Sequence, residues 1–125
     1  MTPWNRRAGK YNRTRVKNGE YEFDSKLESS VYDILKLREK AKEIKIIGLQ
    51  DKVYLTRAEI LYKPDFKIQC TKTHRFSWVE AKGPEIGRWN VIKKLWEVYG
   101  PGELEVWKGT YRNPVLNRTI TPTKG

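Results

Sequence analysis

Residues 62–68 read Tyr-Lys-Pro-Asp-Phe-Lys-Ile and residues 76–82 read Phe-Ser-Trp-Val-Glu-Ala-Lys, and these two stretches decide the fold. Both are rich in aromatic and β-branched residues, which is typical of strands. The polar segment 70–74 between them has the composition of a turn. The sequence therefore predicts two neighbouring strands that can pair as a hairpin.

Three charged residues on these strands are placed by the alternation of side chains between the two faces of a strand. Asp65 lies on the face opposite Phe66, while Glu80 and Lys82 share the face opposite Ala81. If the strands pair as a hairpin, Asp65 and Glu80 come close together with Lys82 beside them.

Two carboxylates at close range repel one another unless a cation lies between them. Mg²⁺ typically takes one or two carboxylates and keeps its remaining positions for water and phosphate oxygens. Lys82 would add a point charge for the attacking water or the phosphate. Asp65, Glu80 and Lys82 are therefore candidates for a metal-dependent phosphodiesterase site.

The acid-x-Lys pattern alone is weak, because it also occurs at Asp24, Glu43 and Asp65, where a solvated charged face explains it equally well. Glu80 differs from these because it ends an apolar strand, is followed shortly by Gly83-Pro84, and comes after the strand with Pro64-Asp65.

Glu28 is a fourth candidate, on a helix that Ser25 is expected to cap and that runs to about residue 42. It shares a helical face with Val31 and Leu35, and a carboxylate that leans toward a core needs a partner or a metal. The alternative is that Glu28 completes a capping box with Ser25, three residues earlier.

The remaining pattern predicts an α/β (α+β) domain with a single central mixed sheet. Asn18-Gly19 indicates a hairpin, and Pro64 suggests an edge strand or a bulge. A second helix is expected after Gly87, because apolar residues follow a helical period from Trp89 to Tyr99. The expected strands are 14–17, 20–23, 44–49, 53–55, 58–68, 74–81 and 104–107.

The chain has 125 residues, with 26 Lys and Arg against 15 Asp and Glu, so its net charge is +11. This balance favours a polyanionic partner, usually nucleic acid and less often an anionic membrane, although a merely soluble basic protein is the plain alternative. Cys70 is the single cysteine and no apolar run approaches membrane-spanning length. We therefore expect a soluble cytoplasmic protein without disulfides or membrane association.

Charge also divides the chain into a basic N-terminal arm over residues 1–13, a core over 14–108 and a basic C-terminal tail over 109–125. Residues 1–19 contain no acid. Basic arms suit phosphate contacts, which give affinity and position without reading bases. The expected DNA contacts in the N-terminal part are Arg6, Arg7, Lys10, Arg13, Arg15 and Lys17.

Three segments of the sequence together resemble the PD-(D/E)xK nuclease superfamily. They are residues 23–28 (Phe-Asp-Ser-Lys-Leu-Glu), 62–66 (Tyr-Lys-Pro-Asp-Phe) and 79–83 (Val-Glu-Ala-Lys-Gly). The likeness covers roughly residues 12–108 and is greatest to the bacteriophage endonuclease I group of Holliday junction-resolving enzymes. It implies a restriction-endonuclease-like αβββαβ core and a homodimer that makes paired nicks in four-way junctions or other branched DNA.

The same resemblance implies two Mg²⁺ ions, with Mn²⁺ able to substitute, and hydrolysis that leaves a 5′-phosphate. Asp65 and Glu80 correspond to the metal-binding acids, Lys82 to the catalytic lysine and Glu28 to the helix-borne acid. If the protein is phage-encoded, its location would be the host cytoplasm. The polar turn between Asp65 and Glu80 departs from the family pattern.

Two other functions remain open at this point. One is a nicking nuclease of DNA repair or transposition, and the other is a non-catalytic nucleic-acid-binding protein. No recognition helix or zinc module is evident in the sequence, which favours recognition of DNA by shape over recognition of a base sequence.

Overall fold

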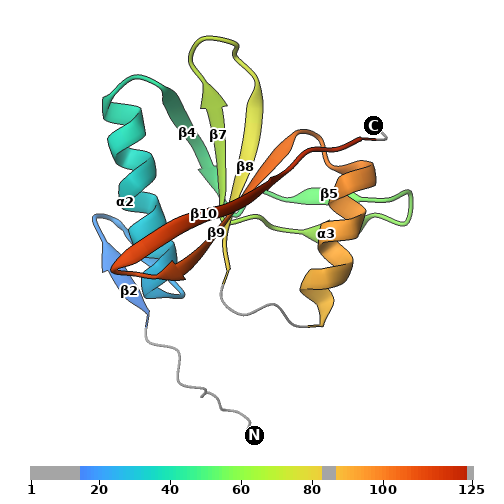
Figure 1. Ribbon diagram of the computed structural model, residues 1–125, viewed down its shortest axis with the longest axis horizontal. Helices are drawn as coiled ribbons and strands as arrows, with labels where there is room; N and C mark the ends of the chain where they lie inside the picture. Colours follow the sequence, from blue (N-terminus) through green and yellow to red (C-terminus); the bar gives the residue numbers. More distant parts are fainter. Residues whose placement is uncertain (1–14, 83–86, 124–125) are drawn as a thin grey trace, which may run out of the picture.

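In the computed structural model, which describes residues 15–82 and 87–123, a five-stranded mixed sheet forms the centre of the protein (Figure 1). The strands lie in the order β10-β9-β8-β7-β4. Strands β8 and β9 run parallel, and the other neighbouring pairs run antiparallel. The bounds are β4 (Ile44–Leu49), β7 (Phe66–Cys70), β8 (Phe76–Ala81), β9 (Glu103–Thr110) and β10 (Asn113–Ile120).

Two helices of the described residues accompany this sheet, α2 (Lys26–Lys40) and α3 (Arg88–Tyr99). Ser25 caps α2 as predicted, and its side chain accepts a hydrogen bond from the Glu28 amide. Helix α3 starts after Gly87 and ends at Gly100, also as predicted. Neither helix is long and apolar enough to cross a membrane.

The order α2, β4, β7, β8, α3, β9 reproduces the predicted arrangement of one helix, three strands, one helix and one strand. The protein is therefore an α/β domain built on a mixed sheet. Two small hairpins and the last strand are added to it. The hairpins are β2 (Val16–Asn18) with β3 (Tyr21–Phe23), and β5 (Val53–Leu55) with β6 (Ile60–Tyr62).

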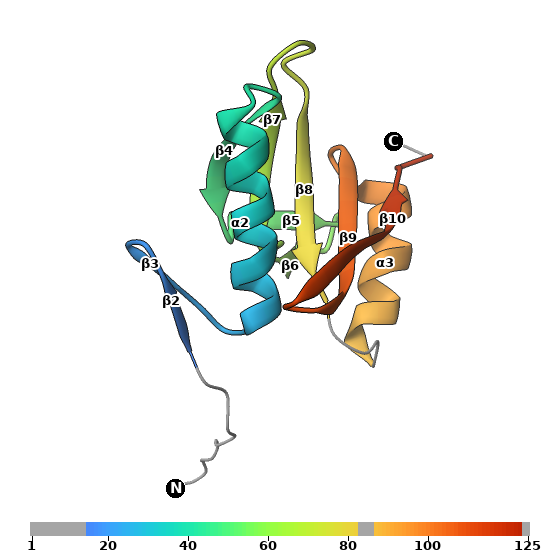
Figure 2. The ribbon, with the colours of Figure 1, turned by 60° about the vertical axis from the view of Figure 1, so that its left-hand side comes forward.

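Side-chain alternation along the sheet divides the apolar residues into two cores, one beside each of the two helices, whose ribbons lie apart in Figure 2. One core joins α2 to the sheet and includes Leu35, Phe66 and Val79. The other joins α3 and the β5–β6 hairpin to the sheet and includes Trp78 and Trp96. Glu80 and Lys82 follow Trp78 at two-residue spacing, so they belong to the α3 side of β8.

The predicted strand over residues 58–68 is wrong as a single element. It divides into β6, which pairs with β5, and β7, which lies inside the main sheet between β4 and β8. Pro64 falls in the break between them, where its missing N–H costs no ladder hydrogen bond. Pro64 therefore marks a crossover between two sheets and does not mark an edge strand.

The predicted C-terminal tail over 109–125 also needs correction. Strand β9 continues to Thr110, and residues 113–120 of the supposed tail form β10, which pairs antiparallel with β9. Ile120 is buried in the α3 core. The sequence signal was weak because most other side chains of β10 are exposed, as is usual for an edge strand.

A charged contact fixes the end of α2 to the first strand of the sheet. The Glu39 carboxylate accepts a hydrogen bond from the Ile46 amide at 3.0 Å and one from the Lys36 ammonium at 3.2 Å. The backbone hydrogen bond, followed by Lys36, lowers the pKa of Glu39 below its ordinary value, although partial burial opposes this. Because the folded-state pKa is lowered, this contribution to stability exists above the unfolded pKa and is lost as pH falls through the folded pKa.

We therefore predict that Glu39→Gln lowers the free energy of unfolding by ~1 kcal/mol at neutral pH. The difference from the wild type should vanish as the solution is acidified below the folded-state pKa of Glu39. Urea denaturation across this pH range measures both values. Glu43→Gln is the matched control, because Glu43 is exposed and its ion pair with Arg38 is long, at 3.8 Å. A loss of unfolding free energy in Glu39→Gln that does not change with pH would contradict the role given to the Glu39 carboxylate.

Candidate active site

The register of the β7–β8 hairpin places the two predicted strand acids opposite one another. Phe66 pairs with Val79, so Asp65 and Glu80 occupy the next position toward the end of the hairpin. The Asp65 carboxylate accepts a hydrogen bond from the Ala81 amide at 2.8 Å. Both acids are buried, and each exposes less than a tenth of its surface. The hairpin therefore brings Asp65 and Glu80 together as the sequence predicts.

Glu80 has a partner on each carboxylate oxygen. The Tyr62 hydroxyl donates a hydrogen bond to Oε1 at 2.6 Å, and the Lys82 ammonium lies 3.6 Å from Oε2. The backbone amide of Lys82 donates to the Trp107 carbonyl at 2.8 Å, and its ammonium lies 5.1 Å from the centre of the Trp89 ring. Backbone and side chain of Lys82 are thus both restrained beside the acids.

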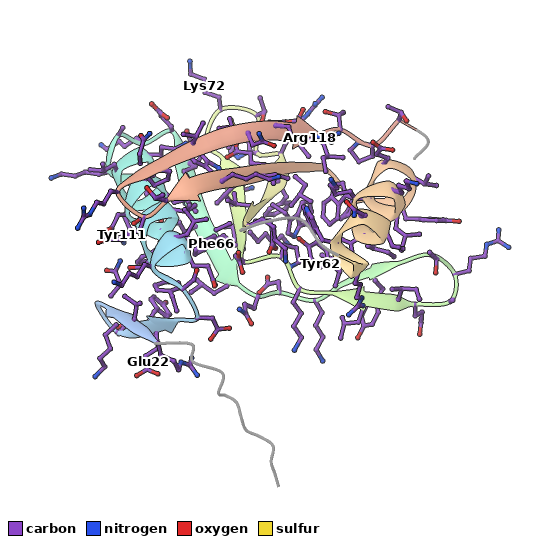
Figure 3. All side chains as sticks on the ribbon, turned by 60° about the horizontal axis from the view of Figure 1, so that its bottom comes forward. Glu22, Tyr62, Phe66, Lys72, Tyr111 and Arg118 are labelled. Atoms are coloured by element: carbon purple, nitrogen blue, oxygen red, sulfur yellow. The ribbon has the colours of Figure 1, made fainter. Side chains whose placement is uncertain are left out.

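The sequence analysis missed Tyr62 as a residue of this site. It ends β6 and packs against Trp89 and Trp96, so the β5–β6 hairpin and α3 together set its position (Figure 3). Its reach to Glu80 depends on how this hairpin folds over the sheet. A tyrosine at a strand end carries no local signal for that contact.

Glu28 takes part in the cap of α2 and also lies beside Asp65. Its backbone amide donates to the Ser25 hydroxyl at 3.1 Å, and the same hydroxyl lies 3.3 Å from the Glu28 carboxylate. Glu28 is also buried, and its carboxyl group raises the pKa of Asp65 through its charge and a hydrogen bond. Helix α2 therefore brings a third acid to Asp65 while the same residue helps to cap the helix.

Burial and mutual repulsion make it unfavourable for all three carboxyl groups of this cluster to be charged at once. Burial, followed by the charges of Glu80 and Glu28, raises the pKa of Asp65 well above its ordinary value. Burial also raises the pKa of Glu80, although the Tyr62 hydroxyl and the Lys82 ammonium act in the opposite direction. Burial and Glu80 raise the pKa of Tyr62, so its hydroxyl keeps the proton that it donates. A cation would relieve this repulsion.

The chemistry of these donors suits a hard divalent cation. Among the described residues, no group of three or more His, Cys, Asp or Glu side chains is placed so that it could together hold a metal ion, as a protein cage would. Mg²⁺ does not need such a cage, because it typically binds through one or two carboxylates together with waters and phosphate oxygens. The pair Asp65 and Glu80 fits that requirement, whereas a structural zinc site would need about four protein ligands.

A cleft of about 400 Å³ gives access to Asp65 and Glu28 between the β2–β3 hairpin and the end of β4. Arg15 also lines this cleft, where its guanidinium lies 3.5 Å from Glu22 and 3.9 Å from Asp24. A larger cavity of about 770 Å³ lies at the opposite end of β8, around the β7–β8 turn. It contains none of the three buried acids, so the smaller cleft is the better candidate for the reaction.

The expected DNA contacts are only partly placed by the structure. Arg15 lies in the cleft, and Lys17 is an exposed residue of β2 whose backbone pairs with Glu22. The other four, Arg6, Arg7, Lys10 and Arg13, lie outside the described residues.

The fold and site define an α/β domain with a buried acid pair and a lysine at one end of its central hairpin. The chain belongs to the family described as "Protein of unknown function (DUF1064)", whose model matches residues 8–110. No curated protein and no solved structure matches the chain. The family match includes all four candidate site residues and ends before β10.

Repulsion among the acids leads to a prediction for the metal-free protein. Glu80→Gln should raise its free energy of unfolding by ~1 kcal/mol, because the amide keeps an acceptor for Tyr62 while one buried charge is removed. Chemical denaturation in EDTA measures the change, with exposed Glu22→Gln as control. A clear loss of stability in Glu80→Gln would show that the acids do not strain the metal-free fold.

Proposed function

We propose that this protein is a Mg²⁺-dependent, structure-selective DNA endonuclease of the PD-(D/E)xK type, and that it resolves Holliday junctions by phosphodiester hydrolysis. The observation that carries the proposal is the buried pair Asp65 and Glu80 with the Lys82 ammonium beside it. The order of helices and strands and the net charge of +11 support it. A purely structural role does not explain the buried acid pair, because buried acids without a cation cost stability.

Each residue of the site has a distinct role under this proposal. Asp65 and Glu80 would hold Mg²⁺ or Mn²⁺, and Glu28 would approach the same ion from α2. When bound, the ion supplies charge stabilisation at the phosphate and makes a coordinated water more acidic. Tyr62 orients the Glu80 carboxylate through its hydrogen bond.

Lys82 acts on the substrate as a fixed positive charge. Its two restraints, the Trp107 carbonyl and the Trp89 ring, keep the ammonium near the acids. From there it can contact the attacked phosphate or orient the incoming water. Water adds its oxygen to phosphorus, the bond to the 3′-oxygen breaks, and the products are a 5′-phosphate and a 3′-hydroxyl.

Selection of DNA by shape is favoured by how the site is built. The cleft is lined mainly by polar and charged side chains, and both helices of the described residues pack into the two cores. Symmetric nicks in a four-way junction require two active sites, so we propose that a homodimer is the active form. Arg15 would exchange its acidic partners for a DNA phosphate at the entrance of the cleft.

We predict that the protein cuts four-way junctions in a Mg²⁺-dependent reaction with paired, symmetric nicks. Flap, nicked and linear duplexes of the same sequences should be cut far more slowly. Gel analysis of the products with and without Mg²⁺ tests this directly. Preferential cutting of nicked or flap DNA would indicate the repair-type nuclease, and equal cutting of linear duplex would contradict structure selection.

Lys82→Ala in the same assay separates catalysis from binding. The variant should lose at least ~100-fold in cleavage rate, because one preorganised charge at the phosphate is removed, while its affinity for the junction stays within a few fold. Lys45→Ala, which removes an exposed lysine of β4, is the matched control. Undiminished cutting by Lys82→Ala would refute the assigned site. Binding without any cutting by the wild type would favour a non-catalytic binding protein.

A further inference from the structure

The turn between β9 and β10 lies next to the candidate site. Lys82 donates its backbone hydrogen bond to Trp107 of β9, and β9 then continues over residues 108–110, about 10 Å further. The turn that follows is fixed by Gly109, whose φ of 95° and close approach to the Asn113 carbonyl leave no room for a Cβ atom. The turn therefore projects beyond the edge of the sheet at which Lys82 lies.

The same turn is fastened to the first turns of α2, the helix that carries Glu28. The Ser30 hydroxyl donates to the Tyr111 carbonyl at 2.7 Å. The views in Figures 2 and 3 place the turn, labelled by Tyr111 in Figure 3, against the beginning of α2. Its position relative to the acids is thus set by two elements, β9 and α2.

Two cations gather on the Tyr111 ring at this place. The Lys26 ammonium lies 4.9 Å from the ring centre, and the Arg112 guanidinium lies 5.4 Å from it. The Arg112 Nε also donates to the Tyr111 hydroxyl at 3.0 Å. Among the described residues, neither cation forms an ion pair with an acid, and all three side chains are exposed. We call these three residues the turn cluster.

The turn cluster carries two electrostatic costs. Lys26 and Arg112 are like charges held on one ring, and Lys26 is also the first residue of α2, where the helix dipole disfavours a cation. Contact with the aromatic ring offsets these costs only partly at an exposed site. A bound anion would relieve both costs.

We propose that the turn cluster binds a backbone phosphate of the DNA strand that enters the candidate site. This inference rests on the proposed function for the identity of the polyanion and deepens it by naming where the strand is held. Two cations held side by side can both contact the oxygens of one phosphate diester, which carries a single negative charge. Because both cations contact the Tyr111 ring, the ring serves to place them and is not primarily a surface for base stacking.

The test compares two double variants that remove the same charge from opposite ends of the sheet. Lys26→Gln with Arg112→Gln alters the turn cluster. Lys72→Gln with Arg75→Gln alters two exposed cations at the β7–β8 turn, which lies at the far end of β8 (Figure 3). Binding of a four-way junction is measured by fluorescence anisotropy in EDTA over a range of salt concentrations, so that no DNA is cut.

The turn-cluster variant should bind about tenfold more weakly, and its slope of log affinity against log salt should be shallower by about one, because one phosphate contact is lost. A fraction of unfolded protein that is constant over the salt range lowers the affinity but leaves the slope unchanged, so the slope remains decisive if the variant is less stable under those conditions. The β7–β8 variant should keep the wild-type slope. Equal changes in the two variants would overturn the proposal, because the effect would then come from net charge alone.

Tyr111→Leu distinguishes the role of the ring. It should weaken binding to junction and linear duplex alike, because it releases the two cations without removing charge. Weakening confined to DNA with unpaired bases would contradict the phosphate site and indicate stacking. Cleavage by the wild type is scored separately. If the wild type cuts DNA but binding does not depend on the turn cluster, this inference alone is refuted. If binding depends on the turn cluster but the wild type does not cut, the nuclease proposal is refuted.

Discussion

The pairing of β7 with β8 is the constraint on which the candidate site depends. Their register sets Asp65 opposite Glu80, and the hydrogen bond from the Ala81 amide to Asp65 fixes the end of the hairpin. A shift of one residue would turn Glu80 and Lys82 toward the α2 core and bring Val79 to the α3 side. Both cores therefore protect the register, because each depends on the same alternation along β8.

The surroundings of the acids moderate the cost of burying them without removing it. Tyr62 comes from a hairpin between β4 and β7, Lys82 from the end of β8, and Glu28 from the first turn of α2. Tyr62, Lys82 and a hydrogen bond with the Asp65 backbone favour the charged form of Glu80, whereas Glu28 adds to the repulsion. Stability alone would favour an apolar residue in place of one acid. This cost is the reason for the proposal that a cation binds between the acids.

The sequence could predict the residues that local patterns specify, namely the Ser25 cap, the two helices and the faces of Asp65, Glu80 and Lys82. The sequence did not predict the features that depend on contacts between residues far apart in the chain. Pro64 suggests an edge strand or a bulge within one strand, whereas the chain breaks there into β6 and the inner strand β7. The residues of β10 look like a tail because an edge strand with exposed side chains has little apolar period. Tyr62 and Tyr111 gain their roles from elements that are far apart in sequence.

The claim that Asp65 and Glu80 hold a divalent cation can be tested most directly in crystals of the protein grown with Mn²⁺. Anomalous scattering from Mn²⁺ locates the ion without reference to any activity. The account predicts a strong anomalous peak in contact with the carboxylates of both Asp65 and Glu80, and its loss in Glu80→Gln. Saturating Mn²⁺ with no peak between these two residues, or a peak that persists unchanged in Glu80→Gln, would contradict the account.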